Sequence, residues 1–203
     1  MLSPDGMIAG SKVIGTSGRA DTVIRSAVAN ARSPQDLATR LISQSPEGGF
    51  GVVHADNPRS LATVLSLKAE WTSPHGVVMT GKTVPFSIPV GIDFLPYQTF
   101  RQYLSASGER RYPIIVGSGV NTWTYDIGLP DGYSLDSVPP ASKVENSAGL
   151  YTATYEASED RMRVSRRLTI NKDIYEPDEY PALQALLYAL IDDARSSAFV
   201  TRR

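Results

Sequence analysis

Cysteine is absent from the 203-residue sequence. The chain can therefore form no disulfide bond, and it offers neither a thiolate ligand for a metal ion nor a cysteine nucleophile. Histidine is scarce, and His54 and His75 are its two examples. His54 lies near Asp56 and could form an acid–base pair or bind a metal, but a lone histidine at a strand end is more often solvated or hydrogen-bonded. We expect no metal site, no cofactor and no enzymatic activity.

An excess of charge of one sign is also absent. The sequence has 20 basic and 21 acidic residues and a formal net charge of −1 at pH 7, so no long-range field attracts nucleic acid or anionic lipid. No apolar run approaches the roughly 20 residues needed to cross a bilayer, and the first ten residues lack the pattern of a signal peptide. We expect no nucleic-acid partner and no membrane insertion, and the oligomeric state stays open.

Apolar and polar residues alternate in four segments, which is the pattern of half-buried antiparallel strands. The segments are 61–73, 121–133, 149–157 and 161–170. The last two are separated by a short polar stretch, which predicts a β-hairpin. Weaker patterns predict one or two strands in 6–31, with 20–30 included. Another strand or two is predicted in 76–90, where Pro85 and Pro89 favour sheet edges or strand ends.

Two segments have helical patterns instead. Ser33 can cap a helix near 33–45, and Pro34 suits its first position. The second helix follows Asp178, which can serve as its N-cap, and has Pro181 in its first turn. Its broad apolar face consists of Tyr180, Leu183, Leu186, Leu187, Leu190, Ile191 and Ala194. We expect this face to cover the chain's own sheet, with docking on another domain as the alternative.

These patterns together predict a mainly β fold, an antiparallel β-sandwich with a short helix near 33–45 and a C-terminal amphipathic helix. We expect residues 1–203 to form a single β-rich unit with a sub-boundary near 105–111. On this division, residues 1–110 are a β-rich half with the short helix, and residues 111–203 contain β-hairpins and the C-terminal helix.

Four aromatic residues recur at every third position in 91–111 and are the best candidates for an interaction surface. They are Phe94, Tyr97, Phe100 and Tyr103. Tyrosine and phenylalanine are enriched in the cores of protein interfaces. Packing inside the protein is the commoner role of such rings and is the favoured alternative.

Arg166 has an unusual position, because it shares a predicted strand face with Val164 and Leu168. An unpaired buried charge would cost several kcal/mol. We therefore expect a carboxylate, or several carbonyl oxygens, within hydrogen-bond reach of its guanidinium.

Residues in the last third follow a distinctive order: a Leu-Pro-x-Gly-Tyr turn, a later proline, an arginine among apolar strand residues, and a Pro-x-x-Tyr helix start. They are Leu129, Pro130, Gly132, Tyr133, Pro139, Arg166, Pro177 and Tyr180. In this order the chain resembles the C-terminal β-rich tail of bacterial transglutaminase-like proteins. Those proteins also have an N-terminal β-sandwich of unknown function and a papain-like core with a Cys-His-Asp triad. The resemblance is most specific over 111–203.

The resemblance implies a non-catalytic accessory or interaction module that packs on, or assists, a separate cysteine-dependent catalytic core. No triad residue can be transferred to this chain, because it has no cysteine. The resemblance also implies a protein partner and a periplasmic or cell-envelope location.

A free-standing β-sandwich that binds a polysaccharide or another cell-envelope ligand is the alternative. A carbohydrate-binding module usually exposes a row of aromatic side chains. Here the strand aromatics fall on apolar faces, which favours the accessory module. These aromatics are Trp71, Trp123, Tyr125, Tyr151 and Tyr155.

Overall fold

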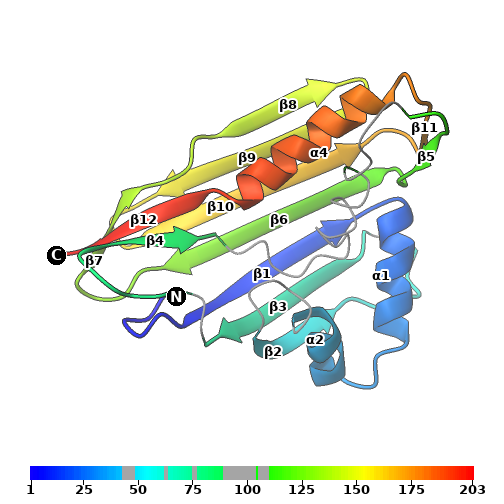
Figure 1. The fold of residues 1–203 in the computed structure, drawn as a ribbon. Coiled ribbons are helices and arrows are strands. Elements are labelled where there is room, and N and C mark those ends of the chain that lie inside the picture. The colour runs from blue at the N-terminus through cyan, green and yellow to red at the C-terminus, as the bar shows by residue number, and fades with distance from the viewer. Residues whose placement is uncertain (43–48, 62–63, 75–76, 89–103, 105–109) are drawn as a thin grey trace.

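The computed structural model describes residues 1–203 apart from 43–48, 62–63, 75–76, 89–103 and 105–109. Its main element is a seven-stranded sheet whose neighbouring strands are all antiparallel (Figure 1). In spatial order the strands are β2 (Phe50–Ala55), β3 (Ser66–Ser73), β1 (Ile8–Thr16), β6 (Gly119–Gly128), β10 (Arg161–Ile170), β9 (Gly149–Ala157) and β8 (Ser142–Asn146). The predicted mainly β, antiparallel fold is confirmed, and so is the β9–β10 hairpin.

Two smaller sheets accompany the large one. Strands β4 (Thr83–Ser87), β12 (Ser197–Arg202) and β7 (Tyr133–Ser137) form a three-stranded sheet with β12 in the middle. Strands β5 (Ile114–Ile115) and β11 (Ile174–Tyr175) form a two-stranded ribbon. Pro85 lies in β4, an edge strand, as predicted. Proline has no N–H group to donate, and an edge strand tolerates this because one of its sides has no partner strand.

The core lies on one face of the seven-stranded sheet. Directly paired residues of neighbouring strands point to the same face. The pairs Lys12–Tyr125 and Tyr125–Val164 therefore show that β1, β6 and β10 all direct side chains to this face. Figure 1 shows α4 (Tyr180–Ala194) and the three-stranded sheet in front of this face, and their apolar residues belong to the same buried cluster. Thr124 and Arg167 point to the opposite, exposed face. The predicted alternation of buried and exposed positions is therefore confirmed in these strands.

Helix α4 covers its own sheet, as predicted. It contacts β8 and β9, and Leu187 and Leu190 are 0% and 6% exposed. Pro181 falls in its first turn, but the prediction that Asp178 caps the helix is wrong. The N-cap is Glu179, without a side-chain capping bond. The Glu179 carboxylate instead pairs with Lys172 and accepts a hydrogen bond from the Glu176 N–H, which closes the turn before the helix.

The short helix predicted near 33–45 is α2 (Pro34–Ile42), which lies against β2. Its start has the predicted cap, because the Asp36 N–H donates to Ser33 Oγ at 3.0 Å. Asp36 in turn accepts a hydrogen bond from the Arg32 N–H at 2.9 Å, so the cap satisfies one free donor of the first turn and one backbone donor just before the helix. Among the described helices, none is long and apolar enough to span a membrane.

The strand predicted in 20–30 is a helix, α1 (Arg19–Ala29). Only the first part of 6–31 is extended, as β1. Asp21 and Arg25 form an ion pair at 2.6 Å across one helical turn, and Arg25 also donates to the carbonyl oxygens of Pro58 and Ser60. These contacts favour a helix over the β preference of the valine and isoleucine residues in this segment.

Candidate functional site

The sequence-predicted interaction residues Phe94, Tyr97, Phe100 and Tyr103 lie outside the described residues, as does His75. Their role stays a prediction. His54 is exposed on β2, where it pairs with Lys68 of β3. Its sequence neighbour Asp56 accepts a hydrogen bond from the Ser66 N–H at 3.3 Å. The described part of the chain contains no group of three or more His, Cys, Asp and Glu side chains that could hold a metal ion.

Arg166 has the carboxylate partner that its sequence position predicts. Its Nε donates to Asp193 Oδ2 of α4 at 2.7 Å, and both side chains are 3% exposed. The Tyr151 hydroxyl donates to the same Asp193 oxygen at 2.7 Å, and the Tyr155 hydroxyl donates to Oδ1. Three donors from the strands β9 and β10 thus converge on one carboxylate of the helix.

The surroundings of the two tyrosines raise the pKa values of their hydroxyl groups. Burial, and then the negative charge of Asp193, raises the pKa of the Tyr151 hydroxyl far above its ordinary value. Burial also raises the pKa of Tyr155. Both phenols therefore remain hydrogen-bond donors at neutral pH. Because the ion pair is closed to solvent, the cluster fastens α4 to the sheet and gives a substrate no access.

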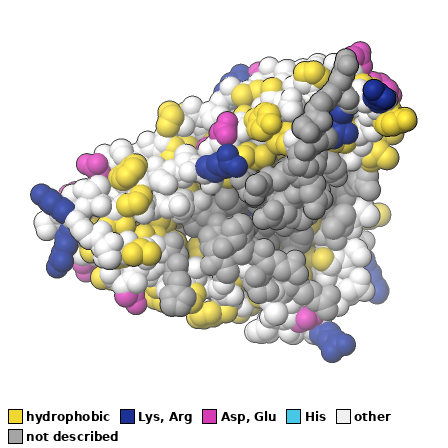
Figure 2. Space-filling model, in the orientation of Figure 1, with side chains coloured by type: hydrophobic (Ala, Val, Ile, Leu, Met, Phe, Trp, Pro, Cys, Tyr) yellow, Lys and Arg dark blue, Asp and Glu magenta, His cyan; other side chains and the backbone are white. Residues whose placement is uncertain are grey.

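The β5–β11 ribbon presents the first of two exposed surfaces. The pair Ile114–Tyr175 is buried, with 6% and 1% exposure, whereas the next pair, Ile115–Ile174, is 57% and 50% exposed. Tyr112, two residues before β5, is 78% exposed. We call Tyr112, Ile115 and Ile174 the tip surface. Figure 2 shows hydrophobic side chains at the end of the molecule where Figure 1 places β5 and β11.

Several hydrogen bonds hold the ribbon in place. The buried Tyr175 hydroxyl donates to the Ala148 carbonyl at 2.8 Å. The Val116 N–H donates to the Asp173 carbonyl at 2.9 Å, and the Ser118 N–H donates to the Asp173 carboxylate at 2.6 Å. The Asp173 bonds therefore join the two segments of the ribbon to each other, and the Tyr175 bond ties the ribbon to Ala148. The exposed isoleucines thus sit on a hydrogen-bonded backbone.

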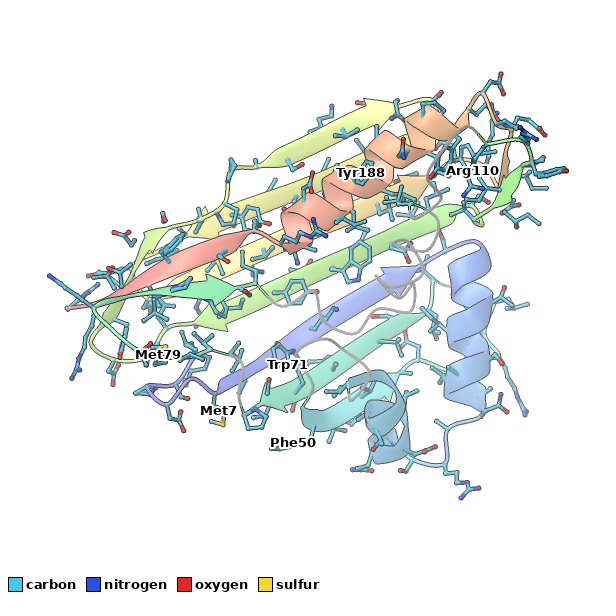
Figure 3. The ribbon with its side chains drawn as sticks, in the orientation of Figure 1. Met7, Phe50, Trp71, Met79, Arg110 and Tyr188 are labelled. Carbon is cyan, nitrogen blue, oxygen red and sulfur yellow. The ribbon has the colours of Figure 1, made fainter. Side chains whose placement is uncertain are left out.

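The second exposed surface is a hollow of about 850 Å³ at the β2 edge of the seven-stranded sheet. We call it the β2 hollow. Its lining includes Ser11, Gln35, Phe50, Lys68, Glu70, Trp71 and Thr72. Phe50 is 65% exposed, whereas Trp71 is 8% exposed. Figure 3 shows both aromatic residues at the end of the sheet nearest α2.

Local sequence periodicity predicts neither surface. The adjacent residues Ile114 and Ile115 read as one apolar run, and only their pairing with β11 shows that one is buried and the other exposed. Phe50 is the first residue of its strand, and its pairing with Thr72 places it on the exposed face. The one available signal was an aromatic residue next to a pair of glycines.

A family model described as "Domain of Unknown Function with solved-structure structure (DUF3858)" matches residues 90–200, which is more than half of the chain. The chain belongs to the DUF3858 family. The tip surface and the Arg166–Asp193 pair lie within the DUF3858 match, whereas every residue of the β2 hollow precedes it. A search of curated proteins found no match to this DUF3858 chain.

Among solved structures, the chain is similar to the crystal structure of a candidate protease from Parabacteroides distasonis ATCC 8503. The two share 14% sequence identity with a TM-score of 0.47, and the alignment covers 95% of this chain. The DUF3858 chain spans 40% of the length of that protein.

Proposed function

We propose that this chain is a non-catalytic accessory module of a transglutaminase-like protein, and that its tip surface packs on a separate cysteine-dependent catalytic core. Two observations support the family part of this proposal. The chain belongs to the DUF3858 family, and the residues that resemble the tail of transglutaminase-like proteins, from Leu129 to Tyr180, fall inside the matched region. We place the module in the periplasm or cell envelope by the same resemblance.

The exposed Ile115–Ile174 pair carries the docking part of the proposal. A ribbon of two residue pairs needs only its buried pair to pack on the protein, so the two exposed isoleucines are not explained by stability. Exposed apolar residues that gather on one surface are typical of interaction sites. Since both ends of the ribbon are hydrogen-bonded, a partner that binds there orders little additional backbone, which reduces the entropic cost of binding.

The chemistry of the chain supports a non-catalytic role. Acyl transfer on a papain-like core requires a thiolate beside a histidine, and the sequence has no cysteine. The buried ionisable cluster of Arg166 and Asp193 is used to hold α4 on the sheet. We therefore expect the chain alone to give only background rates with amidase, esterase and transglutaminase substrates. Turnover that is lost in a His54→Ala variant would contradict this expectation.

The docking proposal is tested with the catalytic core itself. The core is taken from the same reading frame or operon, and its binding to the full 203-residue chain is measured by calorimetry. We expect a one-to-one complex, and we expect Ile115→Ser combined with Ile174→Ser to weaken it at least about tenfold, because central apolar residues dominate interfaces.

The matched control is Phe50→Ala, which removes an exposed aromatic ring far along the chain from the ribbon and should leave the affinity unchanged. Circular dichroism of each variant confirms that it is folded. Equal affinity of the double serine variant and the parent chain, or no core encoded beside this chain, would overturn the proposal.

A further inference from the structure

We infer that the β2 hollow is a binding site for an uncharged saccharide, a function separate from docking on a catalytic core. The hollow has a volume of about 850 Å³, which lies in the range of small-molecule sites. Its lining combines one exposed ring, Phe50, with several polar side chains. Nothing in the tip surface or in the Arg166–Asp193 cluster uses these residues.

The side chains of the hollow come from two rows that cross three strands. Phe50 pairs with Thr72, and Val52 pairs with Glu70, while β1 continues the second row with Ser11. Because directly paired residues point to one face of the sheet, these five side chains share a face. That face is opposite to the one that carries the core, so the rows are open to a ligand.

The polar groups of the hollow are available to a ligand. Within the described part of the chain, the side chains of Ser11, Gln35 and Thr72 form no hydrogen bond. Lys68 and Glu70 approach each other only to 3.8 Å, and their side chains are 60% and 65% exposed. Hydroxyl, amide, ammonium and carboxylate groups together supply both donors and acceptors.

This combination matches the chemistry of a sugar. A saccharide hydroxyl both donates and accepts hydrogen bonds, and the apolar C–H face of a sugar ring can pack on an aromatic ring such as Phe50. The charges of Lys68 and Glu70 cancel, so the hollow favours a neutral ligand over an anionic or a cationic one. An extended peptide at the β2 edge is the competing occupant, and the experiment below includes it.

Two glycines fix the shape of the hollow. A Cβ atom at Gly49 would lie 2.3 Å from the Thr72 carbonyl oxygen, and one at Gly51 would lie 2.1 Å from the Glu70 carbonyl oxygen. Any side chain at either position would displace β2 from β3. The close contact of the two backbones gives the hollow a preformed floor, which lowers the cost of binding.

The test is titration of the ¹⁵N-labelled full chain with cellopentaose, chitopentaose and maltopentaose, followed by NMR. We expect at least one sugar to shift the amide signals of Phe50, Glu70 and Thr72 in a saturable way. Phe50→Ala should weaken that binding about fivefold to tenfold, because one stacked ring is lost. Glu70→Ala should weaken it in the same direction.

Matched controls are Tyr188→Ala, which removes another exposed ring, and Glu145→Ala, which removes a carboxylate that pairs with Lys143 on β8 as Glu70 does with Lys68 on β3. Both should bind as the parent chain does. Absence of saturable shifts with all three sugars, or equal weakening by Tyr188→Ala, would overturn the inference. Saturable binding at the hollow by an extended, uncharged peptide but by none of the sugars would overturn it as well. Failure of the docking test above would leave these sugar titrations unaffected, since the two use different residues.

Discussion

The carboxylate of Asp193 accepts hydrogen bonds from the hydroxyl groups of two tyrosines and from the guanidinium of Arg166. An ion pair closed to water is stable only when its hydrogen bonds are complete, because each charge has lost its hydration. Removing one member leaves the other buried and unpaired. The stability of the protein should therefore depend strongly on this residue.

We expect Asp193→Asn to lower the free energy of unfolding by about 3–5 kcal/mol, since the Arg166 charge would remain buried without its partner. Urea denaturation followed by circular dichroism measures the change. Glu145→Gln, in an exposed pair with Lys143, is the control and should cost less than about 1 kcal/mol. Similar losses in the two variants would show that the buried pair has no special role.

The buried tyrosines predict a loss of stability at high pH. Burial raises the pKa of Tyr151 above the ordinary value of 10.0, so above pH 10 the unfolded chain releases a proton that the folded chain keeps. The full stabilisation is present below pH 10, and it is lost progressively as the pH rises above it. The slope should be up to about 1.4 kcal/mol per pH unit for each such tyrosine.

Urea melts at a series of pH values between 8 and 11 test this expectation. Tyr151→Phe should be less stable than the parent chain at neutral pH, and its stability should fall less steeply above pH 10. An identical pH slope in the parent and the variant would mean that Tyr151 ionises equally in the folded and unfolded chain.

At the scale of elements, α4 is the cover of the sheet, and its leucines are the main contact. Leu187 is 0% exposed, so Leu187→Ala should leave a cavity and cost about 2–5 kcal/mol of stability. Denaturant melts measure the loss, and sedimentation velocity shows whether association changes with it. An unchanged melting midpoint together with reduced self-association would mean that Leu187 serves a contact between chains.

The elements differ in how well the sequence predicts them. The β9–β10 hairpin and α4 were predictable because their patterns, with period two and period 3.6, extend over nine or more residues. Helix α1 was not, because its isoleucine and valines favour a strand locally. Arg25 of this helix donates to the carbonyl oxygens of Pro58 and Ser60, which lie more than 30 positions away in the sequence.

The candidate surfaces were less predictable than the elements. The burial of Arg166 required a partner, and the sequence predicted that a partner exists but did not identify Asp193 in α4. Phe50 and Trp71 are both strand aromatics, and the rows of paired residues decide that one is exposed and the other buried. Such rows depend on strand register between distant segments, which local periodicity does not report.

At the scale of the whole molecule, the family match and the sheets have different boundaries. The match begins at residue 90, but the seven-stranded sheet takes β1, β2 and β3 from residues before it, and β1 pairs directly with β6. Likewise β4 pairs with β12. The matched region therefore shares both sheets with the preceding residues.

We expect a fragment of residues 90–203 not to fold cooperatively, because it would expose the edges of β6 and β12 and the apolar side chains Trp123 and Tyr125. Proton NMR and urea melts compare it with the full chain, which is the control. A fragment with dispersed amide signals and a sigmoidal melt would show that the matched region is an independent unit, with a boundary close to the one predicted near 105–111.

The position of β12 between β4 and β7 also bears on how the chain is made. The hydroxyls of Thr83 and Thr201, in β4 and β12, are hydrogen-bonded at 3.0 Å although 118 residues separate them. A ribosome adds about 5–20 residues per second, so Thr201 is synthesised roughly 6–24 seconds after Thr83. Throughout that delay β4 has no neighbour in its sheet. Its apolar residues Val84 and Phe86, which are buried in the folded chain, lack the packing that β12 provides. Contacts of such high contact order also form slowly once the chain is complete. The nascent protein therefore passes through a prolonged interval in which it is open to chaperones and prone to aggregate.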